Sequence, residues 1–242
     1  MQENELKNKA KIEQLFDEQA KLYLNFAEQS FTWNYLEKVA FDYYISDLYS
    51  PFRLVLDVGC GSGRVIKHLI SRGVLPKNIT GVDISSKLLE AAKKDLPQVT
   101  FLHNFVEDIQ IPANTFDLVT SNMLMHYLDN SQLKKCLDKI SDALKKGGSF
   151  FFVESNPDNI PDRRNPENLN KWLNLKTPWG TTMPYFNRDI QSILTNLLEN
   201  LGFRYINGWG VTMSNDGKVN SDKSKKYLKQ TYRVAARFLK AC

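Results

Sequence analysis

The stretch LVLDVGCGSGRV (residues 54–65) combines an apolar strand, an acid and a glycine-rich turn. Its glycines, Gly59, Gly61 and Gly63, stand at alternate positions, and the first of them follows Asp57 by two residues. Glycine in a turn between a strand and a helix lets a ligand approach the backbone closely. The spacing therefore predicts a ligand-binding loop at the carboxyl end of the first strand of an α/β domain.

Two phosphate-binding motifs do not fit this loop. A Walker A loop needs a Gly-Lys pair followed by Ser or Thr, which is missing here. The dinucleotide fingerprint needs a third glycine where Arg64 stands, and this disfavours a nicotinamide-dependent dehydrogenase. Asp57 would repel a pyrophosphate and favour an ammonium group, whereas Asp83, at the end of the next predicted strand, suits the hydroxyls of a ribose. The predicted ligand has a ribose and a positive charge but no phosphate, as S-adenosylmethionine (SAM) does.

Strand and helix patterns alternate over residues 53–155, and two further strand patterns follow near residues 203–211 and 232–240. They predict an α/β fold: a Rossmann-like, seven-stranded, mostly parallel sheet with helices on both faces and an antiparallel last strand. Two helical patterns within residues 1–50 predict an N-terminal helical cap before a SAM-binding domain of residues 51–242. Residues 156–187, rich in proline and aromatic residues, predict an insertion after strand five, in which NLNKWLNL (168–175) could form a short helix.

Composition indicates an ordinary globular protein. The chain has 242 residues, of which 42% are hydrophobic and 24% charged, and its net charge of +5 only weakly favours an anionic partner. The three cysteines form no CxxC pair, so we expect neither a disulfide framework nor a bound metal. No apolar run approaches the roughly 20 residues that span a bilayer, and the first residues lack an apolar signal segment. We therefore expect a cytoplasmic protein without a membrane partner.

Four segments, in this order, resemble the class I SAM-dependent methyltransferases, most closely the branch that includes small-molecule enzymes: LVLDVGCGSG, GVDISSKLLEAAKK, FDLVTSNMLMHYL and ISDALKKGGSFFFVES. The resemblance implies that SAM is the cofactor and S-adenosylhomocysteine (SAH) the product. It implies cofactor contacts from the following residues: Asp57, Gly59, Cys60, Gly61, Gly63, Asp83, Ile84, Leu88, Phe105, Val106, Asn122 and Met123. The family usually has an adenine-binding acid where this chain has Phe105. Backbone and stacking contacts, Asn104 or Glu107 would then hold the adenine.

The acceptor side of the site is less well defined by sequence. His126, just past the fourth strand, is the best candidate for a general base among three histidines, although packing under the next helix would explain it equally well. We expect the insertion, together with the helices of residues 6–48, to fold over the acceptor as a lid, although its aromatic residues could instead extend the core beneath a surface loop. The predicted substrate contacts come from four aromatic residues: Tyr23, Trp172, Trp179 and Tyr185.

The predicted activity is methyl transfer from SAM to an oxygen or nitrogen atom of a small molecule. Residues 121–124 (SNML) lack the proline pair and aromatic residue of amino-methylating DNA enzymes, which disfavours a nucleic-acid substrate. Two alternatives stay open: a SAM-binding regulator or assembly protein without transfer activity, and a protein methyltransferase. The sequence predicts neither the acceptor nor the oligomeric state.

Overall fold

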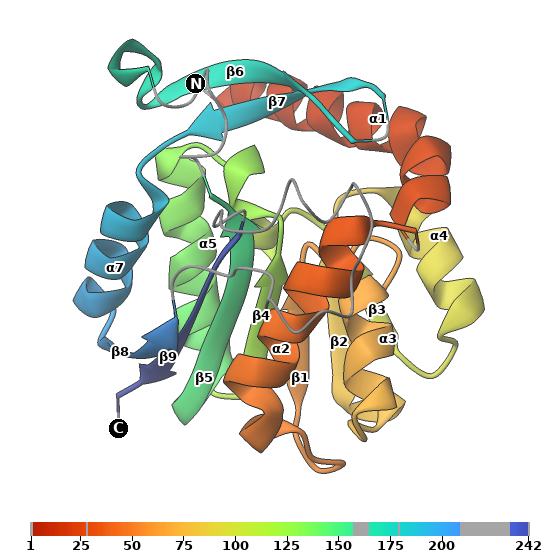
Figure 1. Cartoon of the computed structure of the whole chain (residues 1–242), viewed down its shortest axis with the longest axis vertical. Coiled ribbons are helices and arrows are strands. Elements are labelled where there is room, and N and C mark those ends of the chain that lie inside the picture. Colours follow the sequence, from red (N-terminus) through yellow and green to blue (C-terminus); the bar gives the residue numbers. More distant parts are fainter. Residues whose placement is uncertain (1, 28, 157–164, 179, 209–232, 242) are drawn as a thin grey trace, which may run out of the picture.

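The computed structural model describes residues 2–27, 29–156, 165–178, 180–208 and 233–241. Within these ranges seven strands form one sheet in the order β3-β2-β1-β4-β5-β9-β8 (Figure 1). The strands are β1 (Val55–Val58), β2 (Ile79–Asp83), β3 (Thr100–His103), β4 (Phe116–Asn122), β5 (Leu144–Ser155), β8 (Phe203–Gly208) and β9 (Arg233–Lys240). The first five strands pair in parallel, and β9 runs antiparallel to both β5 and β8. The predicted fold class is therefore confirmed.

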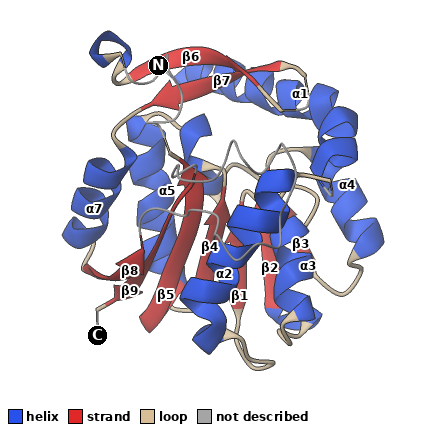
Figure 2. Ribbon diagram, viewed as in Figure 1, coloured by secondary structure: helices blue, strands red, loops and turns tan. Residues whose placement is uncertain are grey.

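Helices cover both faces of this sheet (Figure 2). They include α3 (Arg64–Ser71), α4 (Ser86–Asp95), α5 (Asn130–Ala143) and α7 (Ile190–Asn200). Successive side chains of a strand point to opposite faces, and β5 shows how this builds two cores. Phe150 and Phe152 pack with residues of α5 and α7, whereas Phe151 and Val153 pack with the N-terminal helices and α3. Burial on both faces explains why β5 is apolar without alternation.

The N-terminal helices divide between two places. They are α1 (Gln2–Ala27), the π-helical turn η1 (Trp33–Glu37), α2 (Lys38–Ile45) and the turn η2 (Ser46–Leu48). Phe41 and Ile45 of α2 are fully buried in the core that faces α3. In contrast, α1 lies across the edge of the sheet at which the glycine loop emerges (Figure 1). None of the helices in the described ranges is long and apolar enough to cross a membrane.

The predicted insertion contains a β-hairpin instead of the short helix expected at residues 168–175. After the turn η7 (Pro166–Asn168), strand β6 (Lys171–Lys176) pairs antiparallel with β7 (Thr182–Asn187). Leu173 and Leu175 are half-buried opposite Tyr185 and Met183, which are buried, while Asn174 between the two leucines is exposed. The backbone of these residues pairs with β7 instead of forming a helix, so the helix prediction was wrong. The hairpin lies beside α1 over the sheet (Figure 1).

Candidate functional site

The glycine loop is tied to the end of the neighbouring strand. Gly59, Gly61 and Gly63 have φ angles of 72°, 52° and 80°, a region that glycine adopts without strain. The backbone N–H of Gly59 donates to the carbonyl of Val82 at 2.9 Å, and that of Gly61 donates to the Asp83 carboxylate at 2.8 Å. These bonds fix the loop over the carboxyl ends of β1 and β2, where α/β sheets bind ligands.

Gly61 and Asp83 face a cavity of about 730 Å³. A Cβ atom built on Gly61 would lie 3.8 Å from both Leu88 and Tyr23, which line this cavity, so a side chain there would occupy ligand space. Asp83 accepts one backbone N–H on each oxygen, from Gly61 and from Ser85, and each oxygen keeps a lone pair for another donor. Burial raises the pKa of Asp83.

Asp57 lies outside the cavity wall and is only 1% exposed. Its Oδ1 accepts a hydrogen bond of 2.7 Å from the Thr120 hydroxyl, whereas its Oδ2 has no partner among the residues that the structure describes. Burial, together with the nearby Asp83 charge, raises the pKa of Asp57 to about 7 despite the Thr120 bond. Asp57 is therefore an incompletely satisfied acid next to the loop, and a nearby cation would stabilise its ionised form.

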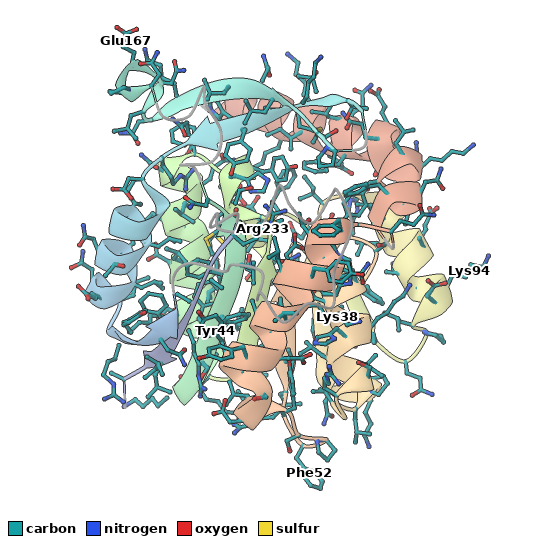
Figure 3. All side chains as sticks on the ribbon, in the orientation of Figure 1. Lys38, Tyr44, Phe52, Lys94, Glu167 and Arg233 are labelled. Carbon is teal, nitrogen blue, oxygen red and sulfur yellow. The ribbon has the colours of Figure 1, made fainter. Side chains whose placement is uncertain are left out.

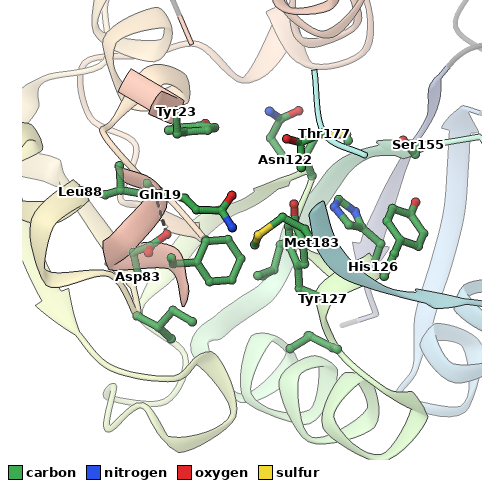
Figure 4. Close-up of a pocket in the computed structure, with 18 of the residues that line it drawn as sticks. Gln19, Tyr23, Asp83, Leu88, Asn122, His126, Tyr127, Ser155, Thr177 and Met183 are labelled. Carbon is green, nitrogen blue, oxygen red and sulfur yellow. Dashed lines mark hydrogen bonds between the residues drawn. The ribbon is translucent and has the colours of Figure 1, made fainter. Parts of the chain in front are cut away.

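The cavity brings together nine of the twelve residues predicted to contact the cofactor: Gly59, Gly61, Asp83, Ile84, Leu88, Phe105, Val106, Asn122 and Met123. Cys60 and Gly63, like Asp57, lie outside its wall. Met123 has a φ of 60°, which is uncommon for a residue with a side chain and is typical of functional sites. Figure 4 shows Tyr23, Asp83 and Leu88 on one side of the cavity and His126 on the other.

His126 is held by a buried carboxylate that sequence reasoning missed. It lies in the turn η5 (Met125–Tyr127), after β4, and its Nδ1 is 2.7 Å from Oε2 of Glu154 near the end of β5. The other Glu154 oxygen accepts the backbone N–H of Met125 at 2.6 Å. The ring of Tyr185 stacks on the His126 ring with centroids 4.3 Å apart. Since β4 and β5 are adjacent parallel strands, the acid in SFFFVES was the available signal.

Of the predicted substrate contacts, Tyr23 and Tyr185 line the cavity and Trp172 does not. Trp172 is 43% exposed, and its ring packs edge-on against Phe186, its buried cross-strand neighbour. From β6 the cavity is lined instead by Asn174, Leu175 and Lys176. Trp172 is therefore corrected to a surface residue of the hairpin, while Trp179 lies outside the described residues.

A second feature that the sequence did not reveal is a buried ionic network around Glu37, the last residue of η1. Its carboxylate contacts Arg64 at 3.3 Å, Arg233 at 3.0 Å and the Asn122 amide at 3.1 Å. Burial by itself would raise the pKa of Glu37, but the two guanidinium groups and the amide lower it overall. All four residues line the cavity, and the Arg233 side chain is only 11% exposed. Figure 3 shows Arg233 near the middle of the view and Phe52 at its lower edge.

The helix α1 covers the cavity and is fastened by polar contacts. Asp17 accepts hydrogen bonds from the hydroxyls of Ser85 at 2.6 Å and Ser86 at 2.8 Å, and from the backbone N–H of Lys87 at 3.2 Å. These donors lie at the start of α4, where a carboxylate is stabilised by unsatisfied N–H groups and the helix dipole. The same helix contributes Tyr23 to the cavity wall. Its position therefore depends on the β2–α4 turn that carries Asp83.

Comparison with known proteins gives the following relatives. Residues 55–148 match the model of the methyltransferase domain family. An uncharacterized methyltransferase of Synechocystis is 31% identical over 150 residues, which make up 60% of this chain and 66% of that protein. A ubiquinone biosynthesis O-methyltransferase of Coxiella burnetii is 34% identical over 108 residues, 42% of this chain and 43% of that protein. The chain thus spans less than two thirds of the length of these relatives.

Solved structures share the fold over almost the whole chain, and DhpI is an example. DhpI in complex with SAH superposes with a TM-score of 0.62 at 16% sequence identity, and the match covers 96% of this chain and 97% of that chain. At 16% identity this likeness shows a shared fold and carries no statement about activity. The likeness therefore shows that DhpI shares the overall fold described above.

Proposed function

Because this chain belongs to the family of class I SAM-dependent methyltransferases, we propose that it moves a methyl group from SAM to an oxygen or nitrogen atom of a small molecule. One observation carries the proposal: a single cavity contains both the loop with Gly61 and Asp83 and the His126 ring that Glu154 holds. Gly61 and Asp83 suit the binding of a nucleoside, and His126 with Glu154 suits the removal of a proton from the acceptor.

The residues present fit SAM. The carboxylate of Asp83 has capacity for the ribose hydroxyls, and the bare backbone at Gly61 leaves room beside it. The apolar side chains of Ile84, Leu88 and Val106 line the cavity near Asp83 and suit the faces of an adenine. Asp57 supplies a negative charge near the loop for the ammonium group. When bound, SAM supplies a methyl group on a sulfonium, which reacts by in-line displacement.

The chain's own part in the reaction is to position the acceptor and take its proton. Since the Glu154 carboxylate accepts at Nδ1 of His126, that nitrogen carries the hydrogen and Nε2 is the basic atom. The carboxylate also stabilises the imidazolium that forms when His126 takes a proton from an O–H or N–H group. A hydroxyl or ammonium acceptor needs such a base, because it is a poor nucleophile while it keeps its proton.

The size and walls of the cavity favour a small acceptor. A volume of about 730 Å³ lies within the range of roughly 300–1,000 Å³ typical of small-molecule sites. Phe16, Tyr127, Met183 and Tyr185 line the cavity together with His126 and give it apolar surface. The helix α1 and the β6–β7 hairpin lie over this edge of the sheet (Figure 1) and contribute residues to the cavity wall. We infer that these two elements act as the lid over the acceptor and exclude water from it. The name of the Coxiella relative, an O-methyltransferase, supports an oxygen acceptor.

The test uses SAM with an isotopically labelled methyl group, incubated with the protein and a fractionated extract of small molecules. We expect label in one small-molecule fraction, formation of SAH, and loss of both in His126→Ala. Glu167→Gln, a change on the exposed turn before the hairpin, serves as the control and should keep full activity. Label in protein instead of small molecules would indicate a protein methyltransferase. SAM binding without any transfer would indicate a regulator, and either result contradicts the proposal.

A further inference from the structure

Directly after His126, the turn η5 places a second polar side chain in the cavity wall. Tyr127 lines the cavity and is half-buried. Its ring packs edge-on against Phe16 of α1, with centroids 4.9 Å apart, and its centroid lies 4.1 Å from that of the His126 ring. In the view of Figure 4, Tyr127 lies between Asp83, which suits the nucleoside, and His126, which suits the removal of a proton.

The hydroxyl of Tyr127 has no hydrogen-bond partner among the residues that the structure describes. In contrast to the sealed, unpaired Oδ2 of Asp57, it keeps surface that a ligand can reach. Burial raises the pKa of Tyr127, and Tyr185, Tyr23 and the Glu154 carboxylate add to this rise. The hydroxyl therefore stays protonated and offers an O–H donor to the contents of the cavity.

A hydroxyl without a partner in an apolar cavity costs free energy that a polar ligand atom can restore. Resting on the proposed function, we propose that Tyr127 donates a hydrogen bond to the acceptor atom that receives the methyl group, and thereby selects a hydroxyl oxygen over an amine nitrogen. The reacting atom must present one lone pair to the methyl carbon. A hydroxyl oxygen has a second lone pair for Tyr127, whereas an amine nitrogen has none left.

In this arrangement each part of the acceptor hydroxyl has a defined partner. Its proton passes to Nε2 of His126, one lone pair forms the new bond to the methyl carbon, and the other accepts the Tyr127 O–H. The bond between that carbon and the sulfonium sulfur breaks, and its electron pair stays on the sulfur. The products are a methyl ether, SAH and an imidazolium beside Glu154. The hydrogen bond from Tyr127 also lowers the pKa of the acceptor hydroxyl, because it stabilises the oxygen as the proton leaves.

The experiment uses SAM with an isotopically labelled methyl group and the fractionated extract of small molecules. Mass spectrometry and NMR of the labelled product should place the methyl group on a hydroxyl oxygen. Tyr127→Phe keeps the ring against Phe16 and His126, so its thermal stability and its SAH affinity should not change. Its initial rate at low amounts of the labelled fraction, which follows kcat/KM, should fall by about 3- to 10-fold, the effect of one neutral hydrogen bond. Tyr43→Phe is the matched control and should keep full activity, because Tyr43 is 77% exposed and lies outside the cavity wall.

The possible outcomes separate this inference from the proposed function. A methyl group found on nitrogen overturns the inference but leaves the proposed function standing. An unchanged rate for Tyr127→Phe also overturns the inference, and so does a lower rate that a loss of folded protein accounts for. The absence of any label transfer contradicts the proposed function and this inference with it, so the two failures are distinguishable.

Discussion

Replacing Asp57 with asparagine should stabilise the ligand-free protein while weakening its binding of SAM. Folding raises the pKa of this carboxyl to about 7, compared with about 3.9 for an exposed aspartate. A difference of about 3 units corresponds to about 4 kcal/mol of destabilisation once the group is ionised in both states. Asparagine keeps an oxygen for Thr120 but leaves a buried N–H group without a partner, which costs about 1–3 kcal/mol. The net gain at about pH 8 is therefore about 1–3 kcal/mol.

The sign of this effect depends on pH. An acid whose folded pKa is raised contributes stability that is fully present below its unfolded pKa and is lost as pH rises through the folded pKa. The stability that Asp57 contributes to the wild-type protein should therefore fall between about pH 4 and about pH 7, and the advantage of Asp57→Asn should grow over this interval. Urea unfolding of the ligand-free proteins, followed by tryptophan fluorescence at several pH values, measures both curves.

A matched control is Asp117→Asn, since both oxygens of Asp117 have partners: the backbone N–H of Leu54 and the ammonium of Lys145. This control should lose stability, because an amide cannot accept hydrogen bonds from both Leu54 and Lys145. An Asp57→Asn protein that is no more stable than wild type at about pH 8 would refute the reasoning, because Asp57 would then be a satisfied buried acid. Calorimetry with SAH on the same samples measures the expected opposite change in ligand binding.

Four further predictions concern the same cavity. Gly61→Val should abolish SAH binding because its side chain would enter the space between Leu88 and Tyr23, and an unchanged thermal shift with SAH would contradict the assignment of the loop. Asp83→Ala should weaken SAM binding measured by calorimetry by about 1.5–3 kcal/mol for each ribose bond lost, and full affinity would exclude the ribose role. Glu154→Gln should lower kcat by about 10²-fold or more with little change in SAH affinity, since it removes the charge that supports His126; a fully active variant would reduce the pair to packing. Asp17→Ala removes the acceptor for Ser85, Ser86 and Lys87, so SAH should dissociate faster in stopped-flow experiments, and an unchanged rate would show that these contacts do not hold the cap.

The sequence predicted the sheet because its elements depend on local patterns. The apolar run before Gly59 and the FFF run of β5 identify buried strands whatever the rest of the chain does. The hairpin was missed because the leucines near Trp172 suit a helix as well as a strand, and only β7, in tertiary contact, decides between them. Cross-strand neighbours thus outweighed local propensity.

Local patterns also limit what the sequence predicts about the site. Residues that follow a strand, such as Asp83 and His126, could be assigned to the edge at which parallel strands end. The network around Glu37 could not be predicted, because its partner Arg233 lies 196 residues away and no short motif contains both. Glu154 could be predicted in part. The sequence indicates that β4 and β5 are adjacent, but only the register of these strands shows that Glu154 reaches His126.

The position of β9 has a consequence for how the protein is made. During synthesis β8 leaves the ribosome before β9, yet among the described strands β8 pairs only with β9, and β9 lies between it and β5. Until residues 233–240 emerge, the edge of β5 stays uncovered and Glu37 lacks Arg233. An uncovered apolar edge strand invites association with other chains. The nascent protein should therefore depend on chaperones over this interval, and its cavity should become competent for ligand only with the arrival of β9.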